Sequence, residues 1–313
     1  MSLAIAAHAQ AYPEANYDPG VPTLLDTVGH NHGDAITTSA DLNVFLRALA
    51  EHSPDRMQVV SYGESWQGRD LTYAVISSPS NMARLEGIKG DLATLGNGGS
   101  LSSDSLDETP AVVWLGYGVH GDEVTPSDSA IFIAYHLIAA QDDELVNTIL
   151  DNTIVIIDAN QNPDGRERFI HGFISALGMT PMADRYTAEH DQLWPRGRFN
   201  HYVFDMNRDW FAMTQPETQT KVEAMLDWHP VVFVDSHEMG GDETYFFPPP
   251  APPFNPNITD AQKVRQIQLG RNMARWFDRF GAPYFTREIF DAFYPGYGDM
   301  WPTLNGSIAK TFE

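Results

Sequence analysis

Cysteine is absent from all 313 residues of the chain. This absence excludes disulfides, thiolate nucleophiles and cysteine-based metal sites. Any bound metal must therefore be held by histidine, aspartate or glutamate. The absence of cysteine also agrees with a bacterial protein that is exported from the cytoplasm.

Basic residues are scarce: 19 Lys and Arg face 42 Asp and Glu, which gives a formal net charge of −23. A surface of this charge repels nucleic acid and anionic lipid headgroups, so we expect neither as a partner. Long apolar runs are also missing. No stretch of about 18 apolar residues occurs, and no membrane span is expected.

The N-terminal segment carries a small-x-small pattern, Ala7-His8-Ala9, which is typical of the end of an export signal. We therefore expect residues 1–35 to be an extended lead-in with a signal-peptide remnant. The protein would then be periplasmic or secreted from a bacterium. Residues 36–313 show no internal repeat or clean linker and are expected to form one domain.

Short apolar runs alternate with helical patterns through this domain. Runs at 112–115, 154–157 and 231–234 predict buried strands, and a hairpin is expected at 59–76. Helices are predicted at 39–51, 80–96, 125–140, 216–228 and 260–280. The alternation predicts an α/β fold with a mixed, mostly parallel central sheet flanked by helices.

Polar residues cluster directly after the three buried strands, where open α/β sheets place their sites. His120 and Glu123 follow the first strand with the spacing His-x-x-Glu, and His237 follows the third. Two imidazoles and one carboxylate suit a catalytic zinc ion, which uses three protein ligands and one open position. The sequence therefore predicts one Zn²⁺ held by His120, Glu123 and His237.

The ordered motifs of residues 40–313 resemble the M14 family of zinc carboxypeptidases. The matching segments are Tyr62 to Arg69, His120-x-x-Glu123, Asn162-Pro163-Asp164-Gly165, Asp205-Met206-Asn207-Arg208-Asp209-Trp210, Ser236-His237, and Asp299 with Thr311-Phe312-Glu313. The resemblance implies hydrolysis of C-terminal peptide bonds by a zinc-activated water. The substrate would be a peptide or N-acyl amino acid with a free carboxylate.

The resemblance also assigns roles to individual residues. Glu313 would be the general base, and Arg196 or Arg198 would stabilise the oxyanion. Asn207 and Arg208 would bind the substrate carboxylate, Asp205 would hold the second nitrogen of His120, and Tyr294 or Tyr297 would cover the substrate. Glu238, next to His237, is the second choice for the base.

Three departures from the family pattern are visible. Asp122 stands where many relatives carry a substrate-contacting arginine, and Glu238-Met239 stands where many have Ser-Tyr. The family fold also continues past its catalytic glutamate, so the domain is expected to be truncated at its C-terminal end. Two alternatives stay open: a zinc amidase acting on cell-wall peptides or N-acyl amino acids, and a non-catalytic peptide-binding domain.

Overall fold

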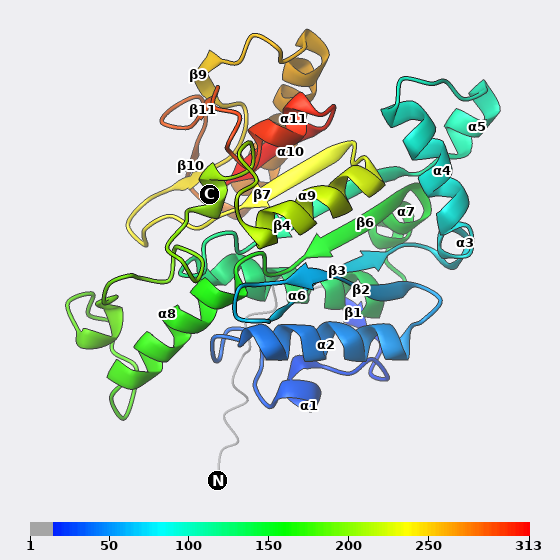
Figure 1. Ribbon diagram of the computed structural model, residues 1–313. Coiled ribbons are helices and arrows are strands. Elements are labelled where there is room, and N and C mark those ends of the chain that lie inside the picture. The colour runs from blue at the N-terminus through cyan, green and yellow to red at the C-terminus, as the bar shows by residue number, and fades with distance from the viewer. Residues whose placement is uncertain (1–14) are drawn as a thin grey trace.

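The computed structural model describes residues 15–313, so the expected signal remnant at residues 7–9 lies outside the described part. A six-stranded sheet runs through the centre in the order β12-β7-β4-β6-β3-β2 (Figure 1). Its strands are β2 (Met57–Glu64), β3 (Asp70–Ile76), β4 (Ala111–Tyr117), β6 (Thr153–Asp158), β7 (Val232–Ser236) and β12 (Ile308–Phe312).

The central sheet is mixed and mostly parallel. β12, β7, β4 and β6 run parallel to one another, whereas β3 is antiparallel to β6 and β2 is antiparallel to β3. The predicted fold class is therefore confirmed. The first two predicted strands lie within β4 and β6, and β7 begins one residue later than expected.

Helices cover both faces of the sheet, which explains why the inner strands are apolar throughout (Figure 1). One core joins the sheet to α2 (Ser39–His52), α6 (Val124–Ala139) and α7 (Glu144–Asn152). The other core joins it to α4 (Leu85–Gly96) and α9 (Pro216–Trp228), with Trp114 and Phe233 fully buried between the layers.

The helix predicted at 80–96 is divided into α3 (Pro79–Met82) and α4. Arg84 has non-helical backbone angles (φ −122°, ψ 19°) and separates the two. The side chain of Asn81 donates to the carbonyl groups of Leu150 and Asp151, each at 3.1 Å. This tertiary contact fixes α3 to the end of α7, and the continuous helix is lost.

The lead-in is not extended throughout, contrary to expectation. Residues Leu24–Val28 form α1, because Thr23 and Asp26 make a capping box and Gly29 ends the helix in the left-handed conformation (φ 97°). Leu24 is buried in the core beneath. Upstream, β1 (Asn16–Tyr17) pairs with β5 (Ala140–Gln141) at the end of α6.

α10 (Asp260–Phe280) packs beside β12, the edge strand of the sheet. Gln266 of α10 donates to the carbonyl of Ala309 at 2.8 Å and fixes this helix beside β12. No helix within residues 15–313 is both long and apolar enough to cross a membrane. The elements not yet named are α5 (Ser103–Glu108), α8 (Pro163–Ala176), α11 (Met300–Leu304), β8 (Tyr245–Phe246), β9 (Ala251–Phe254), β10 (Tyr284–Phe285), β11 (Asp291–Ala292), and 3₁₀ turns at Ala188–His190 and Met206–Arg208.

Candidate metal centre

The carboxyl ends of β4, β7 and β12 meet at one edge of the sheet, because these three strands are parallel neighbours. His120 lies in the loop after β4, His237 directly follows β7, and Glu123 occupies the N-cap position of α6. A side chain at Gly121 would meet the backbone nitrogen of Arg166 at 2.1 Å. The glycine therefore lets this loop pack against the start of α8.

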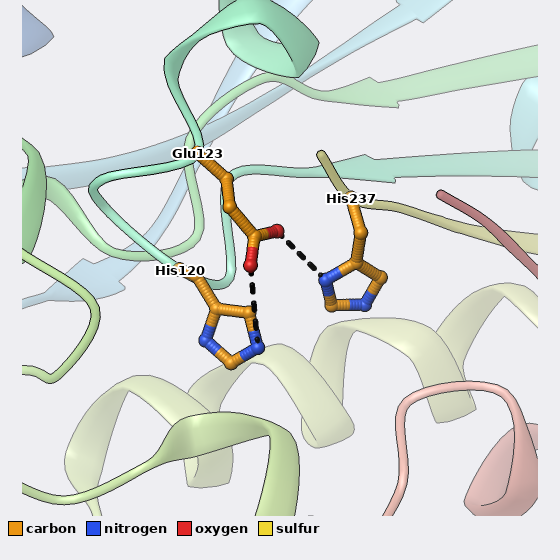
Figure 2. Close-up of side chains that lie close together, drawn as sticks. All are labelled: His120, Glu123 and His237. Atoms are coloured by element: carbon orange, nitrogen blue, oxygen red, sulfur yellow. Dashed lines mark hydrogen bonds and ion pairs between the residues drawn. The ribbon is translucent and has the colours of Figure 1, made fainter. Parts of the chain in front are cut away.

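His120, Glu123 and His237 converge on one point (Figure 2). One ligand atom from each of the three lies within 4.8 Å of the others. Oε2 of Glu123 is 2.9 Å from Nδ1 of His237, and Oε1 is 4.0 Å from Nε2 of His120. Nδ1 of His120 is buried and makes no hydrogen bond within the described residues. Two imidazoles and a carboxylate in this arrangement fit a zinc ion with three protein ligands.

The two histidines differ in their electrostatic surroundings. Burial, together with the charges of His237 and Arg198, holds the pKa of His120 well below its ordinary value. Burial also opposes the charged form of His237, but Asp235 and Glu123 outweigh it and hold the pKa of His237 well above its ordinary value. Oδ2 of Asp235 lies 2.8 Å from Nε2 of His237. A cation at this centre can take the place of a proton between His237 and Glu123.

Asp205 and Arg198 surround the other side of the centre. Oδ1 of Asp205 lies 3.8 Å from Nδ1 of His120, which is an ion-pair distance and longer than a hydrogen bond. Arg198 contacts Oδ2 of Asp205 at 3.1 Å and Oε1 of Glu123 at 3.4 Å. Its guanidinium group therefore brings a positive charge next to the candidate metal ligands.

Asn207 and Arg208 reach the centre from the 3₁₀ turn Met206–Arg208. Nδ2 of Asn207 lies 3.0 Å from Nε2 of His237, and its Oδ1 accepts from the backbone of Gly298 at 2.6 Å. The guanidinium of Arg208 lies 4.7 Å from the centre of the Tyr297 ring. These contacts hold both side chains at the edge of the same cavity.

A cavity of about 250 Å³ opens beside the three candidate ligands. Glu313 lines it, and its backbone is fixed by two hydrogen bonds to Phe246, at 3.0 and 2.5 Å. Burial raises the pKa of Glu313 to about 7, and burial likewise raises the pKa of Asp299, in the same cavity, to about 7. The residues lining this cavity are His120, Arg198, Asn207, Arg208, His237, Ile289, Phe290, Asp291, Tyr297, Asp299, Thr311 and Glu313.

A sequence model of the M14 peptidases, described as zinc carboxypeptidases, matches residues 42–241. The chain belongs to the zinc carboxypeptidase family. The chain matches no curated protein sequence. Its fold is similar to that of many solved structures, among them several carboxypeptidases.

Three of these structures illustrate the likeness to the zinc carboxypeptidases. Carboxypeptidase A from Helicoverpa armigera is 17% identical, with a TM-score of 0.62 over 89% of this chain and 64% of that chain. A metallo-carboxypeptidase from Burkholderia cenocepacia is 16% identical, with a TM-score of 0.55 over 88% and 59%. Thrombin activatable fibrinolysis inhibitor is 12% identical, with a TM-score of 0.59 over 88% and 65%. The chain thus spans less than two thirds of the length of each.

The expected arginine and tyrosine were each one of two alternatives, and one member of each pair, Arg196 and Tyr294, does not line the cavity. Arg196 is exposed, and its backbone carbonyl accepts from Arg168 at 2.9 Å. Tyr294 packs against Tyr297 with ring centres 5.2 Å apart, but Tyr297 alone of the pair lines the cavity. Of each pair, therefore, Arg198 and Tyr297 line the cavity and Arg196 and Tyr294 do not.

Glu238 also faces away from the cavity. Its carboxylate accepts from the backbone and the hydroxyl of Thr125, both at 2.9 Å, near the start of α6. Its own backbone nitrogen donates to Oε2 of Glu123 at 3.1 Å. Glu238 therefore fixes the orientation of Glu123 through its backbone, while its side chain is occupied elsewhere.

The Asn-Pro-Asp-Gly segment of the zinc carboxypeptidase pattern acts as a scaffold. Asn162 caps α8 and donates to the carbonyls of Val119 and Arg198, at 3.2 and 3.1 Å. It therefore ties the loop of His120 to the loop of Arg198. Asp164 accepts from Ser65 at 2.7 Å and pairs with Arg69 at 2.6 Å, which anchors the turn between β2 and β3.

Sequence reasoning gave no role to Asn162, Asp235 or Asp299. Asn162 could have been recognised as an N-cap, because it directly precedes Pro163 at the first turn of a helix. Asp235 sits within the apolar run of β7, where a charged residue needs a partner on a neighbouring loop. Asp299 was matched to the family pattern, but its burial in the cavity was not predicted, because it depends on contacts far along the chain.

Proposed function

We propose that this chain removes C-terminal residues from peptides with one Zn²⁺ held by His120, Glu123 and His237. The observation that carries the proposal is the placement of Arg208 and Asn207 in the same cavity as the two candidate histidine ligands. A guanidinium group binds a carboxylate through two parallel hydrogen bonds. A free C-terminus held there brings the last peptide bond toward the metal centre.

The donor set supports zinc as the metal. The three side chains match the three-ligand pattern of catalytic zinc sites, and His237 has the carboxylate partner, Asp235, that metal-bound histidines usually have. When bound, zinc would supply a water of pKa about 7 and polarise the substrate carbonyl. The family membership supports the same metal.

Glu313 is proposed as the general base. Its burial raises its pKa to about 7, which allows the carboxylate to accept a proton from water and to return it to the leaving amine near neutral pH. Its backbone bonds to Phe246 hold the residue beside the cavity. Proton transfer by a positioned carboxylate contributes roughly 10²- to 10⁴-fold to such reactions.

Arg198 is proposed to stabilise the negative charge that develops on the carbonyl oxygen. It lines the cavity, whereas Arg196 does not. Asp205 and Glu123 hold its guanidinium through contacts of 3.1 and 3.4 Å. A donor that is fixed before the reaction needs no rearrangement when the charge appears. Tyr297, stacked on Arg208, is proposed as the tyrosine that covers the substrate.

The proposal is tested by metal analysis combined with a panel of blocked and free substrates. One equivalent of zinc and cleavage of peptides with a free C-terminus, but not of their amides, is the expected result. Preferred cleavage of N-acyl amino acids or cell-wall peptides would assign the amidase activity instead. Zinc content without turnover of any member of the panel would indicate a binding domain.

A further inference from the structure

A second hollow, of about 530 Å³, lies between α8 and residues 188–197. Phe169 and Phe173 of α8 line one side, with ring centres 6.5 Å apart and planes nearly parallel. Leu193 and Trp194 line the other side and remain 81% and 85% exposed. We call this hollow, defined by these four side chains, the α8 groove. It lies on the part of the chain that projects away from the central sheet (Figure 1).

The exposure of these side chains is unusual for apolar residues. A leucine and a tryptophan on one turn, facing two phenylalanines, form an apolar surface of the kind that proteins use for binding. The volume falls within the range of ligand-binding clefts, about 300–1,000 Å³. Solvation of the bare groove is costly, and an apolar side chain placed there removes that surface from water.

The α8 groove and the metal cavity share a rim. Gly197 lines the groove, and the next residue, Arg198, lines the cavity and contacts Glu123. The backbone of Gly197 donates to the side chain of Gln192 at 3.0 Å, and Gln192 also hydrogen-bonds to Asp122, the neighbour of Glu123. A peptide chain that leaves the cavity over this rim passes directly to the groove.

The inner wall of the α8 groove is held firmly. Arg168 donates to the carbonyls of Arg196, Phe199 and Asn200 at 2.9, 3.1 and 3.0 Å. These bonds fix the loop to α8 beside the rim. The groove is therefore formed before a ligand arrives, and binding does not have to order it.

We propose that the α8 groove is a substrate-binding surface for apolar or aromatic residues that precede the cleaved bond. The inference rests on the proposed exopeptidase function. With the terminal carboxylate on Arg208, the preceding residues leave the cavity over the rim formed by Gly197 and Arg198. Leu193 and Trp194 then bind the side chain of an upstream Leu or Phe, and the enzyme selects peptides over single N-acyl amino acids.

The test uses N-blocked substrates that share one C-terminal residue and differ upstream. The shortest has a single acylated residue before the cleaved bond, and the longer ones add Leu, Phe or Ser. Burial of one apolar side chain predicts a rise in kcat/KM of about 10-fold for the Leu and Phe extensions of the wild-type enzyme. The Leu193→Ala/Trp194→Ala variant should lose this rise while it cleaves the shortest substrate at the wild-type rate.

Phe280→Ala is the matched control, because Phe280 is also a largely exposed apolar residue, at 68%, but lies at the end of α10. The Phe280→Ala variant should keep the full rise in kcat/KM for the Leu and Phe extensions. Calorimetry of the same peptides on the Glu313→Gln variant provides a binding readout without turnover, and should give the same order of affinities. The proposal is overturned if extension brings no gain, or if the double variant keeps the gain. If the wild-type enzyme cleaves no substrate of the series, short or extended, the proposed function itself is overturned.

Discussion

Nη1 of Arg198 lies 3.4 Å from Oε1 of Glu123, although 75 residues separate them in the chain. Arg196, two residues earlier, points to solvent with its backbone in the left-handed region (φ 65°). The turn between the two therefore presents one guanidinium to the metal centre and turns the other away. This difference gives a direct comparison of two arginines in one loop.

Arg198→Ala should lower kcat for the shortest substrate by about 100-fold or more, the usual cost of removing an oxyanion donor. Arg196→Ala should stay within about threefold of the wild type. Steady-state kinetics with the metal content checked in each variant makes the comparison. Equal losses in both variants would contradict the assignment of Arg198 as the donor.

Replacement of His120, Glu123 and His237 together by alanine should abolish stoichiometric zinc binding, because no protein ligand would remain at the centre. Elemental analysis after dialysis measures the effect. His52→Ala, an exposed histidine near the end of α2, should keep one full equivalent. A triple variant that still holds one zinc per chain would show that the metal binds elsewhere.

Arg208→Ala should remove the preference for a free C-terminus. A charge-assisted hydrogen bond is worth roughly 1.5–3 kcal/mol, so the wild-type enzyme should cleave the free peptide about 10- to 100-fold faster than its amide. The variant should cleave the two at similar rates. Arg271→Ala, an exposed arginine of α10, should retain the wild-type preference. Equal cleavage of both peptides by the wild-type enzyme would refute the carboxylate clamp.

Glu313→Gln should lower kcat by about 100-fold or more while zinc stays bound, because the amide cannot accept the proton. Glu238→Gln should retain most of the activity, since the side chain of Glu238 contacts Thr125 rather than the cavity. Measurement of kcat at saturating substrate for both variants distinguishes the two candidate bases. If the Glu313 variant keeps its activity and the Glu238 variant loses it, the base is Glu238.

Lys310 of β12 offers a pH-dependent test of stability. Its side chain is buried, and burial lowers its pKa from 10.5 to about 8. The folded state therefore binds fewer protons than the unfolded state between about pH 8 and 10.5, so stability should rise with pH across this window. Below pH 8 Lys310 is protonated in both the folded and the unfolded state. The full free-energy cost of burying its charge then remains, on the order of 3 kcal/mol.

Lys310→Met should consequently raise the free energy of unfolding near pH 7 by about 1–3 kcal/mol and remove most of the rise above pH 8. Chemical denaturation at several pH values measures both effects. Lys263→Met, on the exposed side of α10, is the control and should leave the pH profile as it is. If Lys310→Met leaves the pH dependence of the free energy of unfolding unchanged, burial does not lower the pKa of Lys310 as stated.

The strands and the candidate ligands could be predicted because their signals are local. Apolar runs marked β4, β6 and β7, and parallel strands bring the residues that follow them to one edge. The choice between Arg196 and Arg198 could not be predicted, because it depends on backbone angles and on Arg168 in a distant helix. The engagement of Glu238 by Thr125 likewise depends on where α6 begins. In both cases a loop residue contacts a helix that is remote in sequence, and the sequence alone does not show such contacts.

Arg168 fastens the loop carbonyls from Arg196 onward, and α8 itself ends at Ala176. Residues 177–195 are thus tied at both ends to the same helix. Insertions, deletions or grafted sequences there would reshape the α8 groove without displacing Arg198 or the ligands beyond it. If the groove binds substrate as proposed, preference for substrates can diversify, by natural drift or by protein engineering, while the candidate metal centre stays unchanged.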